Sequence, residues 1–185
     1  MRKKSSLLSI ISILFISVLL FVIHTIYVET EGRQYYFKNL QSTNLSKETI
    51  NSIRLHENIN SPAFERTYGN ALGKDNNDMY DYFHWKTGLV TASLNKGKNR
   101  GEIVRLIISI SDEGEKPVLE TARGISVGAP KIKVLNKYGG HYYKRSEQGV
   151  EIIGYVDHTQ KSTIEFWLDG KDRVFTIRFD DIKVK

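Results

Sequence analysis

The hydrophobic positions divide the chain into a continuous apolar stretch near the N-terminus and a longer region in which apolar and polar residues alternate. Residues 7–28 contain no Asp, Glu, Lys or Arg. As a helix, this stretch would span about 33 Å, which matches a hydrocarbon core of about 30 Å. A basic tail, residues 1–6, precedes the stretch, and Glu29 follows it. The positive-inside rule therefore predicts a transmembrane signal-anchor helix over residues 7–28, with a cytoplasmic N-terminus and an extracytoplasmic C-terminal domain.

A cleaved signal peptide is the alternative interpretation of this stretch. Such peptides have an apolar region of about 7 to 15 residues, followed by a small-x-small cleavage site. The stretch here is longer, and residues 24–28 (HTIYV) offer no such site. The sequence thus favours an uncleaved single-pass anchor in the cell membrane.

Beyond a short stalk, residues 29–46, the pattern predicts short elements that build one domain over residues 47–185. Pro62 and Pro130 stand where a helix can begin, because the missing N–H of proline is no loss in the first turn. Gly139 is then a C-cap for the second helix. The alternation typical of strands occurs at residues 80–85, 90–94, 102–108, 150–156, 163–168 and 174–179.

The domain contains an internal repeat. The matching segments are residues 48–55 with 120–127, residues 97–100 with 170–173, and Arg105 with Arg178. Three matches in the same order indicate two copies of one unit, at about residues 47–111 and 118–182. The expected fold class is therefore α+β: two tandem units of a helix plus about three antiparallel strands, with the helices packed on one face of the sheet and one transmembrane helix before them.

One segment of the second unit resembles a known group of proteins. Residues 125–130 (ISVGAP), followed by residues 134–139 (VLNKYG), are similar to a recurring pattern of the BLIP-like and BamE (SmpA/OmlA) group, also found in small membrane-anchored or secreted proteins of Gram-positive bacteria. The resemblance covers about residues 48–180. It implies helices on one face of an antiparallel sheet, in domains that bind proteins or scaffold envelope complexes. The first unit departs from the pattern, because His56 replaces the glycine and two extra residues precede the helix.

Alternation also separates the strand residues onto two faces of the sheet. One face, rich in Phe, Ile and Leu, is expected to form the core. The opposite face combines aromatic and basic side chains, as the hot spots of protein interfaces do. Its candidate partner-binding residues are Tyr82, His84, Arg105, Tyr155, Trp167 and Arg178. An ordinary solvated face is the alternative interpretation, because long side chains often cover one another on such a face.

Composition narrows the possible functions. The chain has no cysteine, which excludes disulfides, thiolate metal sites and a cysteine nucleophile. The five histidines form no H-x-H or H-x-x-x-H pair, and no known catalytic or nucleotide-binding motif is present. We therefore expect no metal, no cofactor and no enzymatic activity. The net charge of +6 is too low and too dispersed to indicate nucleic acid binding.

Together these features favour a membrane-anchored, extracytoplasmic binding, regulatory or scaffold domain of the bacterial cell envelope. It would capture a protein or peptide on one face of its sheet. A binder of anionic cell-wall polymer or lipid headgroups is the alternative, because basic residues stand in the predicted hairpin turns at Lys98 and Lys171. An enzyme is a third hypothesis, with no motif to support it.

Overall fold

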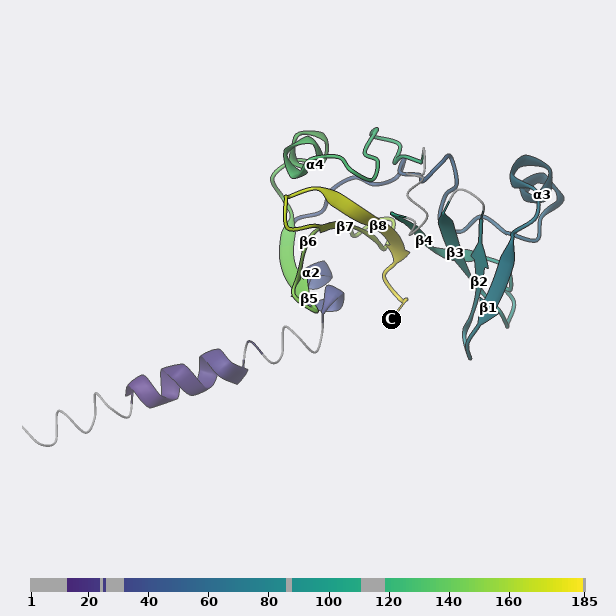
Figure 1. Ribbon diagram of the computed structural model, residues 1–185. Helices are drawn as coiled ribbons and strands as arrows, with labels where there is room; N and C mark the ends of the chain where they lie inside the picture. Colours follow the sequence, from purple (N-terminus) through teal and green to yellow (C-terminus); the bar gives the residue numbers. More distant parts are fainter. Residues whose placement is uncertain (1–12, 24, 26–31, 86–87, 111–118, 185) are drawn as a thin grey trace, which may run out of the picture.

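Eight strands form one antiparallel sheet in the order β1-β2-β3-β4-β8-β7-β6-β5. The computed structural model describes residues 13–23, 25, 32–85, 88–110 and 119–184. The strands are β1 (Gly73–Asn76), β2 (Tyr80–His84), β3 (Leu89–Leu94), β4 (Ile103–Ser109), β5 (Tyr143–Glu147), β6 (Val150–Asp157), β7 (Ser162–Leu168) and β8 (Val174–Asp181). The helices of the domain are α2 (Arg33–Asn39), α3 (Pro62–Tyr68) and α4 (Lys131–Tyr138). Figure 1 shows α3 and α4 on one side of the sheet, and α2 and the C-terminus on the other.

The expected fold class, two tandem units of a helix plus about three strands behind a transmembrane helix, is wrong. Four strands follow each of α3 and α4, and all eight strands join in one sheet because β4 pairs with β8. The unpredicted strands are β1 and β5, which lie at the two edges of the sheet. Their sequences, GKDN and YKRSE, are polar. Edge strands of this kind lack the apolar alternation that marks a half-buried strand, so the pattern did not indicate them.

The predicted transmembrane segment is corrected by the structure as well. Residues 13–23 and residue 25 are helical. Among the described residues, no helix is long and apolar enough to cross a membrane. This finding overturns the predicted signal-anchor, the single-pass topology and the cell-membrane localisation. The basic tail, residues 1–6, and the remaining parts of the predicted segment lie outside the described residues.

The segment expected to be a stalk makes contacts with the sheet. The Thr43 N–H donates to the Val156 carbonyl at 2.7 Å, and the Leu45 N–H donates to Asp157 Oδ2 at 2.6 Å. Helix α2 lies against β6 and the end of the chain, where Gln34 Nε2 donates to the Ile182 carbonyl at 2.5 Å. The division of residues 29–185 into stalk and domain stays a prediction, but part of the stalk packs on the domain.

Local sequence sets the ends of α3 and α4. Ser61 caps α3, where its Oγ accepts from the Phe64 N–H at 3.1 Å, and Pro62 occupies the first turn. Helix α4 follows Pro130 and ends at Gly139, whose φ of 93° satisfies the C-cap geometry and whose N–H donates to the Leu135 carbonyl. The predicted start at Pro62 and the predicted cap at Gly139 are confirmed, and the second helix begins one residue after Pro130.

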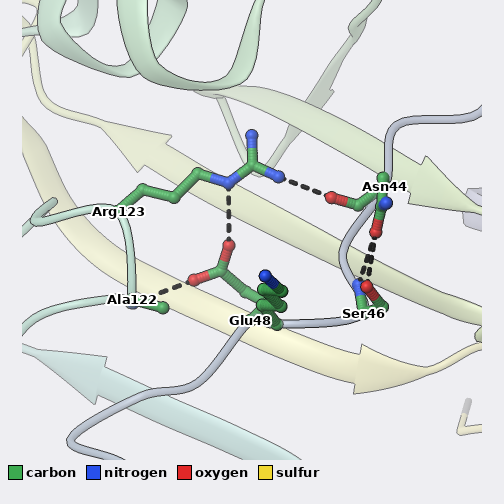
Figure 2. Close-up of a pocket in the computed structure, with 6 residues that line it drawn as sticks. Asn44, Ser46, Glu48, Ala122 and Arg123 are labelled. Carbon is green, nitrogen blue, oxygen red and sulfur yellow. Dashed lines mark hydrogen bonds and ion pairs between the residues drawn. The ribbon is translucent and has the colours of Figure 1, made fainter.

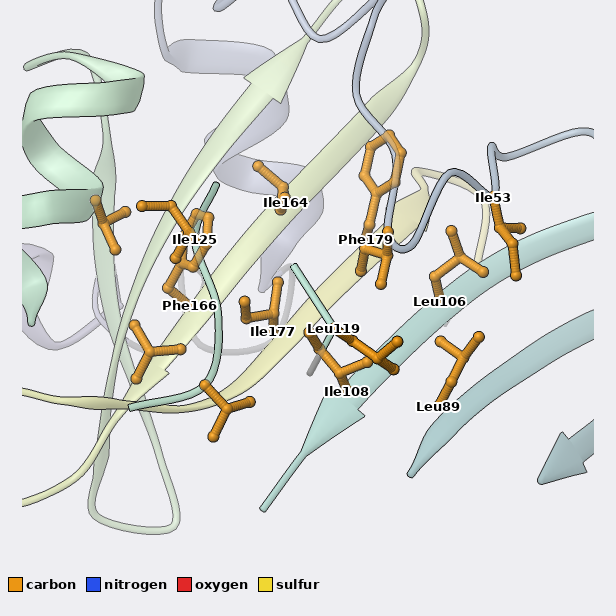
Figure 3. Close-up of a cluster of buried hydrophobic side chains, with 14 of the residues drawn as sticks. Ile53, Leu89, Leu106, Ile108, Leu119, Ile125, Ile164, Phe166, Ile177 and Phe179 are labelled. Atoms are coloured by element: carbon orange, nitrogen blue, oxygen red, sulfur yellow. The ribbon is translucent and has the colours of Figure 1, made fainter. Parts of the chain in front are cut away.

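One apolar core lies between the sheet and the layer of α3, α4 and the loops near them. Phe64 of α3, Val134 of α4, and Phe166 and Ile177 of the sheet all belong to this cluster. Figure 3 shows side chains of β7, β8 and β4 that point to it together with Ile125 from the loop before α4. The core therefore spans both halves of the chain. We call the sheet surface that faces it the core face, and the other surface the opposite face.

Candidate functional site

Cross-strand register assigns the residues of the opposite face. One row runs across the sheet from β7 to β2, and contains Glu165, Arg178, Ile107, Val90 and His84. The row beside it contains Trp167, Thr176 and Ser109. Apart from the buried Glu165, these residues are partly exposed. They form a surface of mixed aromatic, aliphatic and basic character, which we call the Trp167 surface.

Five of the six predicted partner-binding residues lie on the opposite face: Tyr82, His84, Arg105, Trp167 and Arg178. They are not equally available. Arg105 is buried, with 8% of its surface exposed, whereas the other four are partly exposed. Tyr82 packs at the margin of a second, small apolar cluster that includes Val184 near the C-terminus. Tyr82, His84, Trp167 and Arg178 thus remain as the accessible part of the predicted set.

The sixth residue, Tyr155, lies on the core face, and its prediction is corrected. Its ring is fully buried, 5.1 Å from the ring centroid of Tyr138, and its hydroxyl donates to the Gly139 carbonyl at 3.0 Å. Both faces of β6 are covered, because Ile152 on the opposite face is also fully buried. Alternation cannot assign the faces of a strand that is apolar on both of them.

A buried ionic cluster lies at the centre of the opposite face. Asp180 of β8 accepts from Arg105 Nε at 2.9 Å, from Arg105 Nη2 at 3.1 Å and from Arg178 Nε at 2.8 Å, and it also pairs with Arg33 of α2. Burial by itself raises the pKa of Asp180, but the attraction of the three guanidinium groups outweighs it and lowers the pKa below its ordinary value. Asp180 is therefore ionised at neutral pH and holds α2 and β4 to β8.

A second ionic cluster joins β5 to β7. Glu165 accepts from Arg145 Nε at 2.8 Å, from Arg145 Nη2 at 2.9 Å and from the Tyr143 hydroxyl at 2.7 Å. Burial opposes ionisation of Glu165, yet Arg145 outweighs this effect and lowers the pKa of the carboxyl group. Arg145 also pairs with Glu147 at 2.5 Å. The ring of Tyr36, from α2, stacks on Tyr143 at a centroid distance of 4.5 Å.

Trp167 lies between the two clusters. The Arg145 guanidinium is 5.7 Å from the centroid of its ring, and the Arg178 guanidinium is 5.9 Å away. Both are cation–π distances, and Arg is the cation that stacks best on Trp. The indole N–H is buried and has no hydrogen-bond partner among the described residues. The two ion-paired arginines therefore fix the orientation of a partly exposed tryptophan.

Asp180 and Glu165 are both neutralised by arginine, so neither is placed as a general base. In the described part of the chain, no group of three His, Cys, Asp or Glu residues is arranged to hold a metal ion. Sequence reasoning missed Arg145 and Tyr143 as site residues, because they belong to the unpredicted edge strand β5. The period-two spacing of Tyr143, Arg145 and Glu147 is a signal that could have placed them on one face.

A pocket of about 420 Å³ lies at the surface between residues 44–48 and residues 122–123. Figure 2 shows Arg123 extending across it: its Nη2 donates to the Asn44 carbonyl at 2.5 Å, and its Nε pairs with Glu48 Oε2 at 3.2 Å. Glu48 Oε1 accepts from the Ala122 N–H at 3.0 Å, and burial raises the pKa of the Glu48 carboxyl group. The buried charge of this pocket is thus neutralised within the chain, and its geometry indicates a structural role.

Comparison with known proteins identifies weak structural similarities. No family model and no curated protein matches the chain. An extracellular protein containing an SCP domain, from Bacillus anthracis str. Ames, is 8% identical with a TM-score of 0.42, and the match covers 69% of this chain and 44% of that protein. A DUF4309 family protein (YjgB) from Bacillus subtilis subsp. subtilis str. 168 is 11% identical with a TM-score of 0.38, and the match covers 64% and 76% of the two chains. This chain thus spans less than half of the first protein and most of the second. Neither is described as a BLIP-like or BamE protein, and the resemblance to that group stays a prediction.

Proposed function

We propose that this protein is a non-catalytic binding domain that captures an extended, acidic peptide segment of a partner protein on the Trp167 surface. The observation that supports this proposal most directly is the stack of Arg145, Trp167 and Arg178. Tryptophan and arginine are the residues most enriched at the energetic centres of interfaces. Here ion pairs with buried carboxylates hold the two arginines, and the arginines lie against the Trp167 ring, so little side-chain entropy remains to be lost when a partner binds.

Charge indicates the kind of partner. In and around the two ionic clusters, four guanidinium groups face three carboxylates, which leaves an excess of positive charge; the groups are Arg33, Arg105, Arg145 and Arg178 against Glu147, Glu165 and Asp180. The side chains of Arg145 and Arg178 are 14% and 17% exposed, so both reach the surface. Guanidinium groups bind carboxylates in a bidentate geometry. An acidic partner would complement this surface in charge.

Shape and polarity indicate an extended segment. Ile107 and Val90 lie in the same cross-strand row as Arg178 and are partly exposed. A peptide that lies across the strands would meet Trp167 and Arg178 on one side and these aliphatic residues on the other. Because successive side chains of an extended peptide point to opposite sides, alternating acidic and apolar residues would place the acidic side chains toward the arginines and the apolar ones toward the aliphatic residues.

Calorimetric titration with designed peptides tests the proposal. The probes are a soluble peptide of alternating Glu and Leu, the same peptide with Gln in place of Glu, and phosphatidylglycerol vesicles. We expect the acidic peptide to bind saturably and the Gln peptide to bind at least about tenfold more weakly, which corresponds to 1.4 kcal/mol. Binding should weaken as salt is added, because it depends on charge.

Two variants separate the surface from the rest of the domain. Trp167→Thr removes the indole but keeps a residue with high strand propensity, and both arginines keep their carboxylate partners. Tyr68→Thr is the matched control, because Tyr68 is a partly buried aromatic residue that packs against the core from α3, on the other side of the sheet. We expect Trp167→Thr alone to lose peptide binding. Equal binding by both variants would contradict the proposal, and binding of vesicles without binding of the peptide would favour the anionic-polymer or lipid alternative instead.

A further inference from the structure

A pocket of about 280 Å³ lies between α3 and β2, on the core face of the sheet. The aromatic side chains of Phe83 and Trp85 line it, and both are partly exposed although they also pack against the core. Its polar rim consists of four exposed residues: Asn60, Glu65, Gly69 and Asn70. The Trp167 surface belongs to the opposite face of the sheet, so this pocket is independent of the proposed function.

The second half of the sheet provides an internal reference for this pocket. In both halves, a helix is followed by an edge strand that pairs with the next strand. Lys74 pairs with Phe83 in the first half, and Lys144 pairs with Ile153 in the second, so both partners recur at an offset of 70 residues. A residue of the pocket can therefore be compared with the residue 70 positions later, which has the same place beside α4.

The second half closes with apolar side chains the place that the first half leaves open. Trp85 corresponds to Tyr155, which is fully buried, whereas Trp85 is partly exposed. Glu65 corresponds to Leu135, which packs against the core, whereas Glu65 is exposed. An exposed tryptophan beside a carboxylate thus replaces a sealed apolar contact, and the difference exposes apolar surface that the fold is able to cover.

The hydrogen bonds of the two halves differ in the same way. The Tyr155 hydroxyl donates to the Gly139 carbonyl at 3.0 Å. In the first half the Trp85 indole N–H donates to Thr91 Oγ1 at 3.2 Å instead. The Gly69 carbonyl, at the rim of the pocket, therefore accepts no such bond from the described residues.

The polar side chains of the rim are free as well. Asn60, Glu65 and Asn70 make no side-chain hydrogen bond and no ion pair with any residue that the structure describes. Each amide offers two donors and an acceptor, and the carboxylate and the Gly69 carbonyl only accept. The pocket therefore combines an aromatic surface with a ring of donors and acceptors that are open to a ligand.

We propose that this pocket binds one pyranose ring of a neutral saccharide. The C–H groups of such a ring form an apolar face that would lie against Phe83 and Trp85, and its hydroxyl groups, which both donate and accept, would bond to the rim. The volume is just below the range of about 300 to 1,000 Å³ for drug-sized ligands, so it suits a single ring. A quaternary ammonium group would also suit the aromatic rings and Glu65, but it could not bond to the two amides.

NMR titration of the full-length protein tests this proposal. The chain has two tryptophans, so the indole N–H resonances of Trp85 and Trp167 report on the pocket and on the opposite face in one spectrum. The probes are the methyl glycosides of glucose, galactose, mannose and N-acetylglucosamine, with sorbitol and tetramethylammonium for comparison. We expect at least one glycoside to shift the Trp85 resonance saturably and to leave Trp167 unchanged. Sorbitol, which has hydroxyl groups but no ring, and tetramethylammonium should bind at least about tenfold more weakly.

Variants of the rim keep the Trp85 reporter. Glu65→Leu introduces the residue that the second half has at this position, and Asn70→Ala removes one amide. Both should weaken glycoside binding at least about tenfold. Glu65→Leu should unfold at the same or a higher urea concentration, because leucine is also a good helix former. Arg66→Leu is the matched control: Arg66 is the exposed neighbour of Glu65 on α3, does not line the pocket, and its replacement should leave binding unchanged.

Four results would each overturn the proposal. They are the absence of a saturable Trp85 shift with every glycoside at up to about 50 mM, equal binding of sorbitol, tighter binding of tetramethylammonium than of every glycoside, and glycoside binding that Glu65→Leu leaves unchanged. None of these results bears on the Trp167 surface, whose peptide binding is measured separately.

Discussion

Replacing Asp180 with asparagine should lower the free energy of unfolding by about 3 to 5 kcal/mol. The side chain of Asp180 is fully buried, and it is the shared acceptor of Arg33, Arg105 and Arg178. The three arginine side chains are themselves only 9%, 10% and 17% exposed. Asparagine keeps the shape and can still accept hydrogen bonds, but it leaves these buried positive charges without their counter-charge. The expected loss is therefore that of a broken buried ion pair, well above the median of a surface pair at about 0 to 1 kcal/mol.

Urea unfolding monitored by tryptophan fluorescence measures this loss at pH 7. Asp172→Asn is the matched control: Asp172 is 69% exposed and lies 3.6 Å from Lys131, so the same change there removes a surface ion pair. We expect the control to change the free energy of unfolding by less than about 1 kcal/mol. Asp172 has a φ of 55°, which asparagine also tolerates.

The pH dependence provides an independent check. The arginines lower the pKa of Asp180 in the folded protein, so its stabilisation is complete above the unfolded pKa of about 3.9 and is lost as the pH falls through the folded value. The difference between the wild type and Asp180→Asn should thus be constant from pH 7 to about pH 5 and shrink below pH 4. A loss below about 1 kcal/mol at pH 7, or a difference that persists unchanged at low pH, would refute the role assigned to this cluster.

Three further changes test other parts of the structure by urea unfolding. Gly154→Ala should cost about 1 to 3 kcal/mol, because a Cβ there would lie 2.2 Å from the buried, hydrogen-bonded ring of Tyr143, whereas Gly170→Ala, with open space around it, should be neutral. Burial raises the pKa of Glu48 in the folded protein, so protonation of this carboxyl group stabilises the fold at low pH. That stabilisation is lost as the pH rises through the pKa of the folded state. Glu48→Gln should therefore gain stability relative to the wild type between pH 4 and pH 7, and a constant difference would contradict this. Tyr155→Phe should cost about 1 kcal/mol by removing the buried hydrogen bond from its hydroxyl to a backbone carbonyl, and no change would question its place in the core.

Where the local signal was strong, sequence reasoning placed the elements well. Pro62 and Gly139 mark helix ends because proline and glycine act through their own backbone geometry, whatever surrounds them. Alternation placed Trp167 and Arg178 on the opposite face, because residues two apart on a strand must share a face. The match between His56 and Gly128 also came from sequence, and both turns have a positive φ.

The tertiary structure decided three features that the sequence could not: the edge strands, the direction of Tyr155 and the ion pairs. The edge strands β1 and β5 are polar, and only their hydrogen bonds to β2 and β6 show that they are strands. Tyr155 lies in strand β6, which is covered on both faces, so the direction of its side chain depends on the register with β7. The ionic clusters join residues far apart in the chain, such as Arg33 with Asp180 and Arg145 with Glu165.

The features that the sequence determined differ from those that the tertiary structure decided for one physical reason. Backbone geometry, turn chemistry and period-two alternation depend on a few neighbouring residues, so the sequence by itself determined the helix ends and the face on which Trp167 lies. Charge pairing and burial depend on which distant segments meet. The antiparallel pairing of β4 with β8 brings Arg105 beside Asp180, and α2 then adds Arg33 from the other end of the chain. Only the folded sheet therefore shows that the basic residues around Trp167 are ion-paired and fixed in position.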